Sequence, residues 1–378
     1  MVESSLAGAA AERSAAVGGS RRLPVTVVTG FLGAGKTTLL RHLLLHAQRR
    51  LAVLVNEFGE VGIDGDLIAA CGFCPEEERQ GRLVELANGC LCCTVQDEFL
   101  PTMSQLLERA DQLDGIVVET SGLALPEPLV AAFGWPEIRT RTRVHAVVTV
   151  VDGEALAAGH VVGDAEAIEA QRRADPSLDH LSAIEELFEE QLEAADLVLI
   201  SRSDLLSADQ LEQVRQRLNP LLRAGTRVLP MARGAIDPLV VFDDLRSAGS
   251  PGDTAATAHH HHPDDGDDHD LDHDHDHDHH DHTHVAMASV LVRRSGRLER
   301  AALEQRLRQL LSSEPVIRLK GRLIQTDRAL PLQIQAVGPR LECWYEGEAT
   351  AGGGEGLELV VLGAEADRNR LAAAFEGL

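Results

Sequence analysis

The chain is short of positive charge and has no long apolar run. It carries 35 Lys and Arg against 60 Asp and Glu, a formal net charge of −25 over 378 residues. Binding to phosphate backbones needs clustered cations, so this balance argues against a nucleic-acid partner. No stretch approaches the roughly 20 apolar residues that span a bilayer. Residues 1–24 also lack the apolar segment of a signal peptide, so we expect a cytoplasmic protein with no membrane segment.

Lysine and cysteine are both scarce. The chain has only two lysines, Lys36 and Lys320, and arginine takes the other cationic positions. Five of the six cysteines lie between Cys71 and Cys93. Such clustering favours a thiol site in a reducing compartment over a disulfide scaffold. The sixth, Cys343, is isolated and is expected to be a buried core thiol.

Apolar residues are plentiful, and the acidity is concentrated in one tract. Hydrophobic residues make up 44% of the chain, enough for a sizeable core and for two domains at this length. Residues 253–284 hold 11 Asp and no Lys or Arg, which leaves 49 acids against 35 bases elsewhere. We therefore expect an ordinary acidic globular protein that carries an inserted acidic tract.

Short β-branched runs alternate with helical patterns in the first part of the chain. Strands are predicted at residues 25–28, 51–55, 116–118, 146–151 and 197–200, and helices at 39–50 and 181–194. Apolar strands separated by helices indicate an α/β fold with a mostly parallel sheet covered on both faces.

A second unit follows the acidic tract. Strand patterns at residues 287–292, 316–325, 333–337 and 357–362 surround a predicted helix at 298–311, and a last helix is predicted after Glu365. We therefore expect a small C-terminal α+β domain. The predicted organisation is a disordered N-terminus at 1–22, an α/β domain at 23–246, a disordered linker at 247–285 and the α+β domain at 286–378.

The first predicted strand runs into a glycine-rich loop and then a helix, and this loop matches G-x-x-x-x-G-K-[ST]. Glycines permit a tight loop whose amides point at phosphate oxygens, and the helix N-terminus adds positive potential. In this pattern Lys36 reaches the β and γ phosphates and Thr37 ligates Mg²⁺. The predicted phosphate-binding residues are Gly30, Gly33, Ala34, Gly35, Lys36, Thr37 and Thr38.

A P-loop protein also needs an acid at a neighbouring strand end to orient Mg²⁺. Glu119 ends an apolar run and is the predicted partner of Thr37, and Gly122 follows where backbone could approach the γ-phosphate. Asp152, which ends another apolar run, is the alternative candidate for the acid that orients Mg²⁺. Its interpretation as a helix cap is about equally good, because Asp is common at strand-to-helix turns.

Three thiols lie within four residues, at Cys90, Cys92 and Cys93. Close thiolates form a nearly complete tetrahedral site for Zn²⁺ or Co²⁺, and Glu57, which follows the second predicted strand, is the candidate fourth ligand. The alternative is a closed structural zinc knot. Its ligands would be Cys71, Cys74, Cys90 and Cys92.

Four segments together resemble the CobW-type P-loop GTPases, relatives of the HypB and UreG metallochaperones. They are residues 29–38, 56–64, 85–94 and 119–126, and the stretch at 174–180 and the histidine tract resemble the CobW branch of cobalamin biosynthesis. The resemblance implies a GTP-hydrolysing metallochaperone that binds GTP and Mg²⁺ and delivers Co²⁺. The implied partners are a metal-accepting protein, with the cobaltochelatase complex as a candidate, and a second copy of the chain in a nucleotide-dependent homodimer.

The base-recognition segment departs from the Asn-Lys-x-Asp pattern of such GTPases, since it reads Ser201-Arg202-Ser203-Asp204. Asp204 can still accept hydrogen bonds from guanine N1 and N2, which adenine cannot offer. Arg202 is predicted to stack on the base as the stem of Lys would. Ser201 is shorter than Asn and is predicted to lose a base contact, which weakens nucleotide affinity.

The acidic tract is also rich in histidine. Its imidazoles alternate with carboxylates and form a flexible chelator for Zn²⁺, Co²⁺ or Ni²⁺, although a solubilising linker would have the same composition. The residues are His259, His260, His261, His262, His269, His273, His275, His277, His279, His280, His282 and His284.

These features lead to one hypothesis with two rivals. The γ-phosphate and Mg²⁺ would order Glu57 and the three thiols into a Co²⁺ site, and hydrolysis would release the ion. The rivals are a zinc chaperone with the same machinery and a metal-storage protein in which the tract holds the metal. Ligand type alone cannot select cobalt, because Zn²⁺ binds such donors more tightly.

Deletion of residues 253–284 separates the chaperone from the storage protein. The chaperone hypothesis predicts unchanged GTP turnover and continued binding of one metal ion, measured by phosphate release and by metal analysis after dialysis. Loss of most of the bound metal would instead indicate storage.

Overall fold

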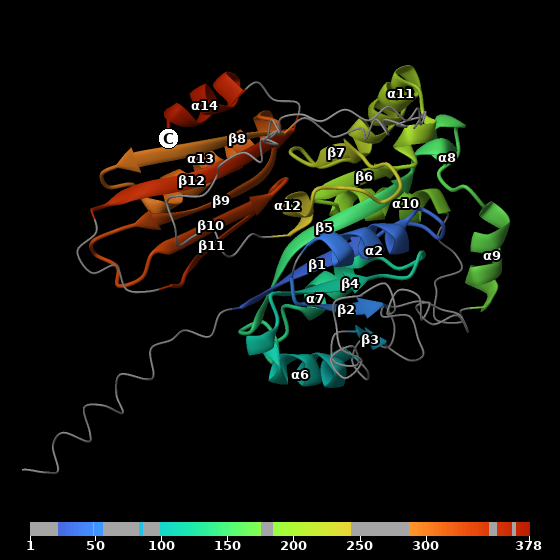
Figure 1. Cartoon of the computed structure of the whole chain (residues 1–378), viewed down its shortest axis with the longest axis horizontal. Helices are drawn as coiled ribbons and strands as arrows, with labels where there is room; N and C mark the ends of the chain where they lie inside the picture. The colour runs from blue at the N-terminus through green and yellow to red at the C-terminus, as the bar shows by residue number, and fades with distance from the viewer. Residues whose placement is uncertain are drawn as a thin grey trace, which may run out of the picture.

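The computed structural model describes residues 22–47, 49–55, 83–85, 99–174, 184–242, 287–347, 354–364 and 368–378. Two sheets organise these residues, one in each half of the chain (Figure 1). The predicted Glu57, the five clustered cysteines and the histidine tract lie outside them. No helix among the described residues is long and apolar enough to cross a membrane.

A seven-stranded parallel sheet forms the first half, in the order β3-β2-β4-β1-β5-β6-β7. Its strands are β1 (Leu23–Thr29), β2 (Leu51–Val55), β3 (Leu83–Glu85), β4 (Gly115–Glu119), β5 (Thr142–Asp152), β6 (Leu197–Ser201) and β7 (Arg227–Pro230). The central strands β1, β4, β5 and β6 are buried along their whole length, as continuous apolar runs require. The predicted α/β fold with a parallel sheet is confirmed.

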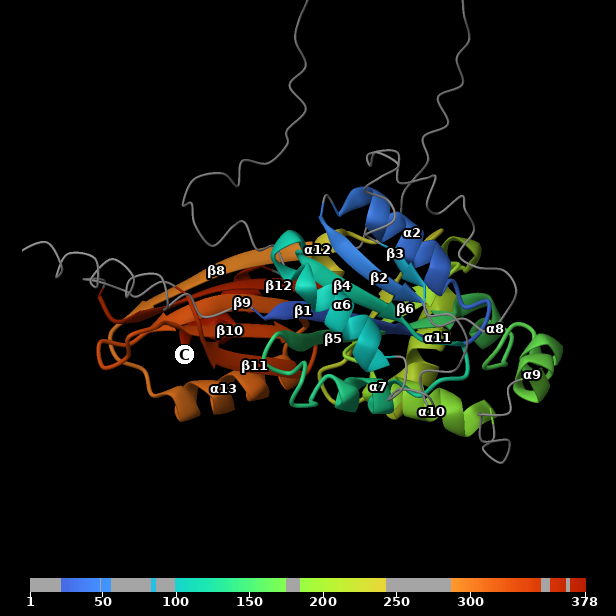
Figure 2. The same ribbon diagram turned by 90° about the horizontal axis from the view of Figure 1, so that it is seen from below.

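Helices cover both faces of this sheet (Figure 2). On one face lie α2 (Lys36–His46) and α12 (Pro238–Val241), and on the other α6 (Leu100–Glu108), α7 (Pro126–Ala132) and α10 (Ile184–Ala194). The remaining helices are α8 (Gly153–Ala157), α9 (Ala165–Ala174) and α11 (Ala208–Leu218). A 3₁₀ turn at Ala110–Gln112 connects α6 to β4, and two others, Ser203–Leu205 and Asn219–Leu221, follow β6 and α11.

Strand β6 shows how the sequence produces two buried faces. Leu197 and Leu199 pack with α2 and α12, whereas Val198 and Ile200 pack with α10 and α11. Successive side chains in a strand point to opposite faces, so a fully apolar strand feeds both cores.

The second half is an antiparallel sheet in the order β11-β10-β9-β12-β8. Its elements are β8 (Met287–Ser295), α13 (Arg300–Ser313), β9 (Val316–Ile324), β10 (Leu332–Val337), β11 (Arg340–Tyr345), β12 (Gly356–Ala364) and α14 (Arg368–Glu376). Both helices pack into one apolar core with the sheet, which confirms the predicted C-terminal α+β unit. The residue boundaries predicted for the domains stay predictions.

Element ends differ from the prediction where tertiary contacts decide them. Helix α2 covers Lys36–His46 rather than residues 39–50, because it begins directly at Gly35, whose φ of 103° ends the loop. Strands β7 and β11 were not predicted, since Arg227, Pro230 and Glu342 break their apolar patterns. Pairing with neighbouring strands holds both in the sheets.

The two halves share a core. Ile317, Val337 and Ala364 of the C-terminal unit join the cluster that contains Leu199 of β6 and Leu43 of α2. The antiparallel sheet is therefore packed directly onto the parallel sheet, and the apolar contact is continuous between them.

Ile317→Ala tests this shared core. Ile317 of β9 is 0% exposed and belongs to the cluster that contains α2 and β6, so its truncation leaves a cavity in that cluster, and we expect the free energy of unfolding to fall by about 2–5 kcal/mol. Leu291→Ala is the control, because Leu291 is 49% exposed and its loss should change stability by less than about 0.5 kcal/mol. Urea unfolding followed by circular dichroism measures both; equal midpoints for the two variants would contradict the shared core.

Candidate nucleotide-binding site

The predicted phosphate loop connects β1 to α2, at the centre of the parallel sheet. Gly30, Gly33 and Gly35 all have positive φ, at 134°, 76° and 103°. At Gly30 a Cβ atom would lie 2.1 Å from the Val150 carbonyl oxygen, so this position excludes any side chain. The glycines therefore do what the motif requires, which is to bend the loop tightly beside β5.

Lys36 begins α2 and is buried, as is Ala34 before it. The ammonium Nζ atom donates to the Phe31 carbonyl at 3.1 Å, across the loop. The Ala34 amide donates to the same carbonyl at 3.1 Å. The charge is thus held within the loop, where phosphate oxygens would meet it together with the helix N-terminus.

Thr37 and Glu119 are brought together from positions 82 residues apart. Thr37 Oγ1 donates to Glu119 Oε1 at 3.3 Å, and Glu119 is buried at the end of β4. A hydroxyl and a carboxylate are hard oxygen ligands of the kind that Mg²⁺ prefers. The contact between Thr37 and Glu119 is as predicted and the pair fits a magnesium ion, while magnesium binding stays a prediction.

Asp152, the rival acid, has other partners. Its Oδ1 atom accepts from the Ala155 amide at 3.2 Å and caps α8, and its other oxygen pairs with Arg202. The helix-cap interpretation of Asp152 is therefore confirmed. Asp152 is thus bonded to Ala155 and Arg202, whereas Glu119 contacts Thr37 directly.

Gly122 follows β4 and lies against the phosphate loop. A Cβ atom here would be 2.5 Å from the Leu32 amide nitrogen. Gln191 of α10 fixes this turn by donating to the carbonyls of Gly122 at 3.4 Å and Ala124 at 3.2 Å. Gln191 carries no local signal in the sequence, because its role depends on a contact made 67 residues away.

The base-recognition segment lies at the end of β6. The backbone of Arg202 adopts the left-handed conformation, with a φ of 53°. Its guanidinium pairs with Asp152 and donates to the Gly33 carbonyl at 3.2 Å. Asp204 pairs with Arg233 at 3.4 Å between Oδ2 and Nε. Arg233 was not predicted, because it lies in a turn after β7 and no motif marks it. Stacking of Arg202 on a base stays a prediction.

Ser201 faces the sheet rather than the open end of the strand. Its hydroxyl donates to the Val151 carbonyl at 3.1 Å, and its Cβ lies 3.4 Å from where a side chain on Gly35 would begin. The Ser201 side chain therefore lies close to the phosphate loop at Gly35. The predicted loss of a base contact at Ser201 stays a prediction.

Metal-binding residues cannot be located within the described part of the chain. No group of three or more His, Cys, Asp and Glu side chains that could hold a metal ion occurs there. Cys343 is half-buried in β11 rather than fully buried as expected. Burial raises the pKa of its thiol to about 12, so it stays protonated at neutral pH and is a poor metal ligand.

Comparisons with known proteins cover both halves of the chain. The family model of the CobW/HypB/UreG nucleotide-binding domain matches residues 24–228, and that of the cobalamin synthesis protein CobW C-terminal domain matches residues 287–378. The zinc chaperone CobW of Pseudomonas aeruginosa is 46% identical over 93% of this chain and 90% of its own length. The zinc chaperone CobW of a Sinorhizobium species is 40% identical over 94% and 97%. The Zn(II)-bound YjiA GTPase of Escherichia coli aligns over 95% of this chain and 99% of its own, at 22% identity and a TM-score of 0.38.

Gly122→Ala tests whether this turn shapes the phosphate loop. The added methyl group would displace the Leu32 backbone, so we expect affinity for a fluorescent GDP derivative to fall by about tenfold or more. Gly354→Ala is the matched control, because no atom lies within 4 Å of its Cβ position. Unchanged affinity in the folded Gly122→Ala variant would show that the contact is irrelevant to the nucleotide.

Proposed function

The chain belongs to the family of CobW, HypB and UreG nucleotide-binding proteins, and from this premise we propose that it is a GTPase that binds and releases a divalent metal cargo. The contact between Thr37 and Glu119, beside the buried Lys36, carries the proposal. Together these residues provide a positive charge for phosphate and oxygen ligands for magnesium at one edge of the parallel sheet.

The segments predicted to bind cargo begin at the same edge. Val55 ends β2 opposite Glu119 of β4, and Glu85 ends β3 opposite Val55. In the sequence, Glu57 follows β2 and Cys90 follows β3. Parallel strands end together, so a change at Glu119 on nucleotide hydrolysis adjoins the end of β2, where the first segment begins, and lies two strands from the end of β3, where the second begins. This adjacency supports coupling of the nucleotide to the cargo site.

Each residue predicted to bind the nucleotide then has a defined role. Loop amides and Lys36 hold the phosphates, and Thr37 and Glu119 would hold Mg²⁺, which neutralises charge that develops on the phosphates. Asp204 reads guanine through N1 and N2, and its pairing with Arg233 places the carboxylate. A water-positioning residue is not evident among the described residues, which favours slow turnover that awaits a partner.

Zinc is the cargo that we propose. Relatives at 46% and 40% identity are named zinc chaperones, and thiolate ligands bind Zn²⁺ more tightly than Co²⁺. Cobalt is the second candidate, because the matching C-terminal family is described by cobalamin synthesis. In the zinc case the acceptor is a zinc-dependent protein, and in the cobalt case a cobalt-inserting complex. We place the protein in the cytoplasm, where thiolates stay reduced.

Competition for metal tests the proposal. Zn²⁺ affinity, measured against a fluorescent chelator, should be about tenfold or more higher with Mg²⁺ and a non-hydrolysable GTP analogue than with GDP. The measurement uses the chain without residues 253–284, so that any zinc held by the histidine tract does not mask the difference between the two nucleotide states. Thr37→Ala should abolish the difference, because it removes a magnesium ligand, and Thr37→Ser should restore it.

Equal zinc affinity in the two nucleotide states would contradict the proposal. Displacement of Zn²⁺ by equimolar Co²⁺ in the GTP-analogue state would favour the cobalt candidate instead. Retention of Zn²⁺ under the same conditions supports zinc as the cargo.

A further inference from the structure

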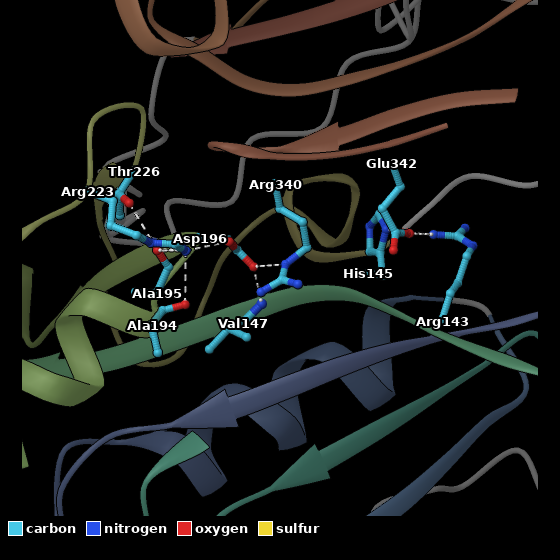
Figure 3. Close-up of polar contacts among 10 residues, drawn as sticks. All are labelled: Arg143, His145, Val147, Ala194, Ala195, Asp196, Arg223, Thr226, Arg340 and Glu342. Atoms are coloured by element: carbon cyan, nitrogen blue, oxygen red, sulfur yellow. Dashed lines mark hydrogen bonds and ion pairs between the residues drawn. The ribbon is translucent and has the colours of Figure 1, made fainter. Parts of the chain in front are cut away.

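A buried carboxylate joins the two halves of the molecule at the start of β6 (Figure 3). Asp196, which is 0% exposed, precedes β6 directly. It accepts from the Val147 amide and from Arg223 Nη2, both at 2.8 Å, and from the guanidinium of Arg340 on β11. A buried charge is tolerated only when it is paired in this way, so Arg340 of the C-terminal unit completes the site of Asp196.

The strands on either side of β6 are held by the same unit. Arg227, the first residue of β7, donates to the Val316 carbonyl at 3.0 Å and the Leu311 carbonyl at 2.9 Å. Near the start of β5, Arg143 pairs with Glu342 of β11 at 3.4 Å. The C-terminal unit thus contacts the amino ends of β5, β6 and β7 together.

The carboxyl ends of these three strands meet in the base-recognition segment. Asp152 at the end of β5 pairs with Arg202, and Arg233 after β7 pairs with Asp204. The three strands are hydrogen-bonded side by side, with Leu197 opposite Val148 and Arg227. Since β6 has five residues, roughly 17 Å of paired strand separates Asp196 from this segment.

We propose that Asp196 and Arg340 are positioning residues, through which the C-terminal domain sets the place of Asp204 and so the selectivity for guanine. The inference rests on the proposed function, because it assumes that Asp204 reads the base. Asp196 precedes β6 and Asp204 follows it, so a displacement of the C-terminal domain that moves Asp196 is passed along this one strand to Asp204. A partner that binds the C-terminal domain could in this way tighten or loosen the nucleotide.

Selectivity between GDP and IDP reports on the position of Asp204. Guanine offers donors at N1 and N2, whereas hypoxanthine lacks the N2 amino group. A well-placed Asp204 therefore favours GDP, and a displaced one loses that preference while the phosphate contacts stay intact. A general loss of folded protein would lower the bound fraction for both nucleotides and leave their ratio of Kd values unchanged.

The experiment compares Arg340→Ala with wild type in the full-length chain, using calorimetric titration with GDP and with IDP. The ratio of Kd values for IDP and GDP should fall by about fivefold or more, through weaker GDP binding, and Arg340→Lys should restore most of it. Glu342→Gln is the matched control. It removes a contact between the same two units, at β5 rather than β6, and should leave the ratio unchanged.

Asp196→Asn provides a second route if Arg340→Ala does not fold. The amide oxygen can still accept from Val147, but the pairing with Arg340 loses its charge, so the ratio should fall in the same direction. An unchanged ratio in the folded variants, or an equal fall in Glu342→Gln, would overturn the inference. Failure of the proposed function would look different, because wild type itself would then bind GDP and IDP equally.

Discussion

The common edge formed by parallel strands is the constraint on which the rest of this structure depends. Each strand pairing in the first sheet is parallel, so the carboxyl ends of β1, β4, β5 and β6 meet on one side. Glu119 and Asp152 are the last residues of β4 and β5, and the phosphate loop and the base-recognition segment lie at the ends of β1 and β6. Residues far apart in the sequence become neighbours for this reason alone, and their chemistry follows from the placement.

The fold and the phosphate site could be predicted because their signals are local. The glycines, Lys36 and Thr37 are fixed by covalent spacing, and Glu119 is marked by the apolar strand that it ends. The contact between Thr37 and Glu119 then follows from strand order. Arg233 and Arg340 could not be predicted, because a salt bridge formed across the fold leaves no pattern in the segments that contribute to it.

The contacts between the two halves of the chain explain part of the scarcity of lysine. Arginine can donate to several acceptors from one planar group, which suits contacts between two packed units. Arg223, for example, bonds the carbonyls of Ala194 and Ala195 as well as the Asp196 carboxylate (Figure 3). Arg227 bonds three carbonyls of the C-terminal unit. Lys36 is placed where a compact point charge is needed.

The central claim is that hydrolysis of the nucleotide releases the metal. The most direct measurement is a single turnover in which the protein, loaded with Zn²⁺ and Mg²⁺-GTP, is followed by a zinc indicator and a phosphate sensor together. We predict that zinc appears with the same rate constant as phosphate, or after it. Release of zinc before phosphate, or retention of zinc after all GTP is consumed, would contradict the claim.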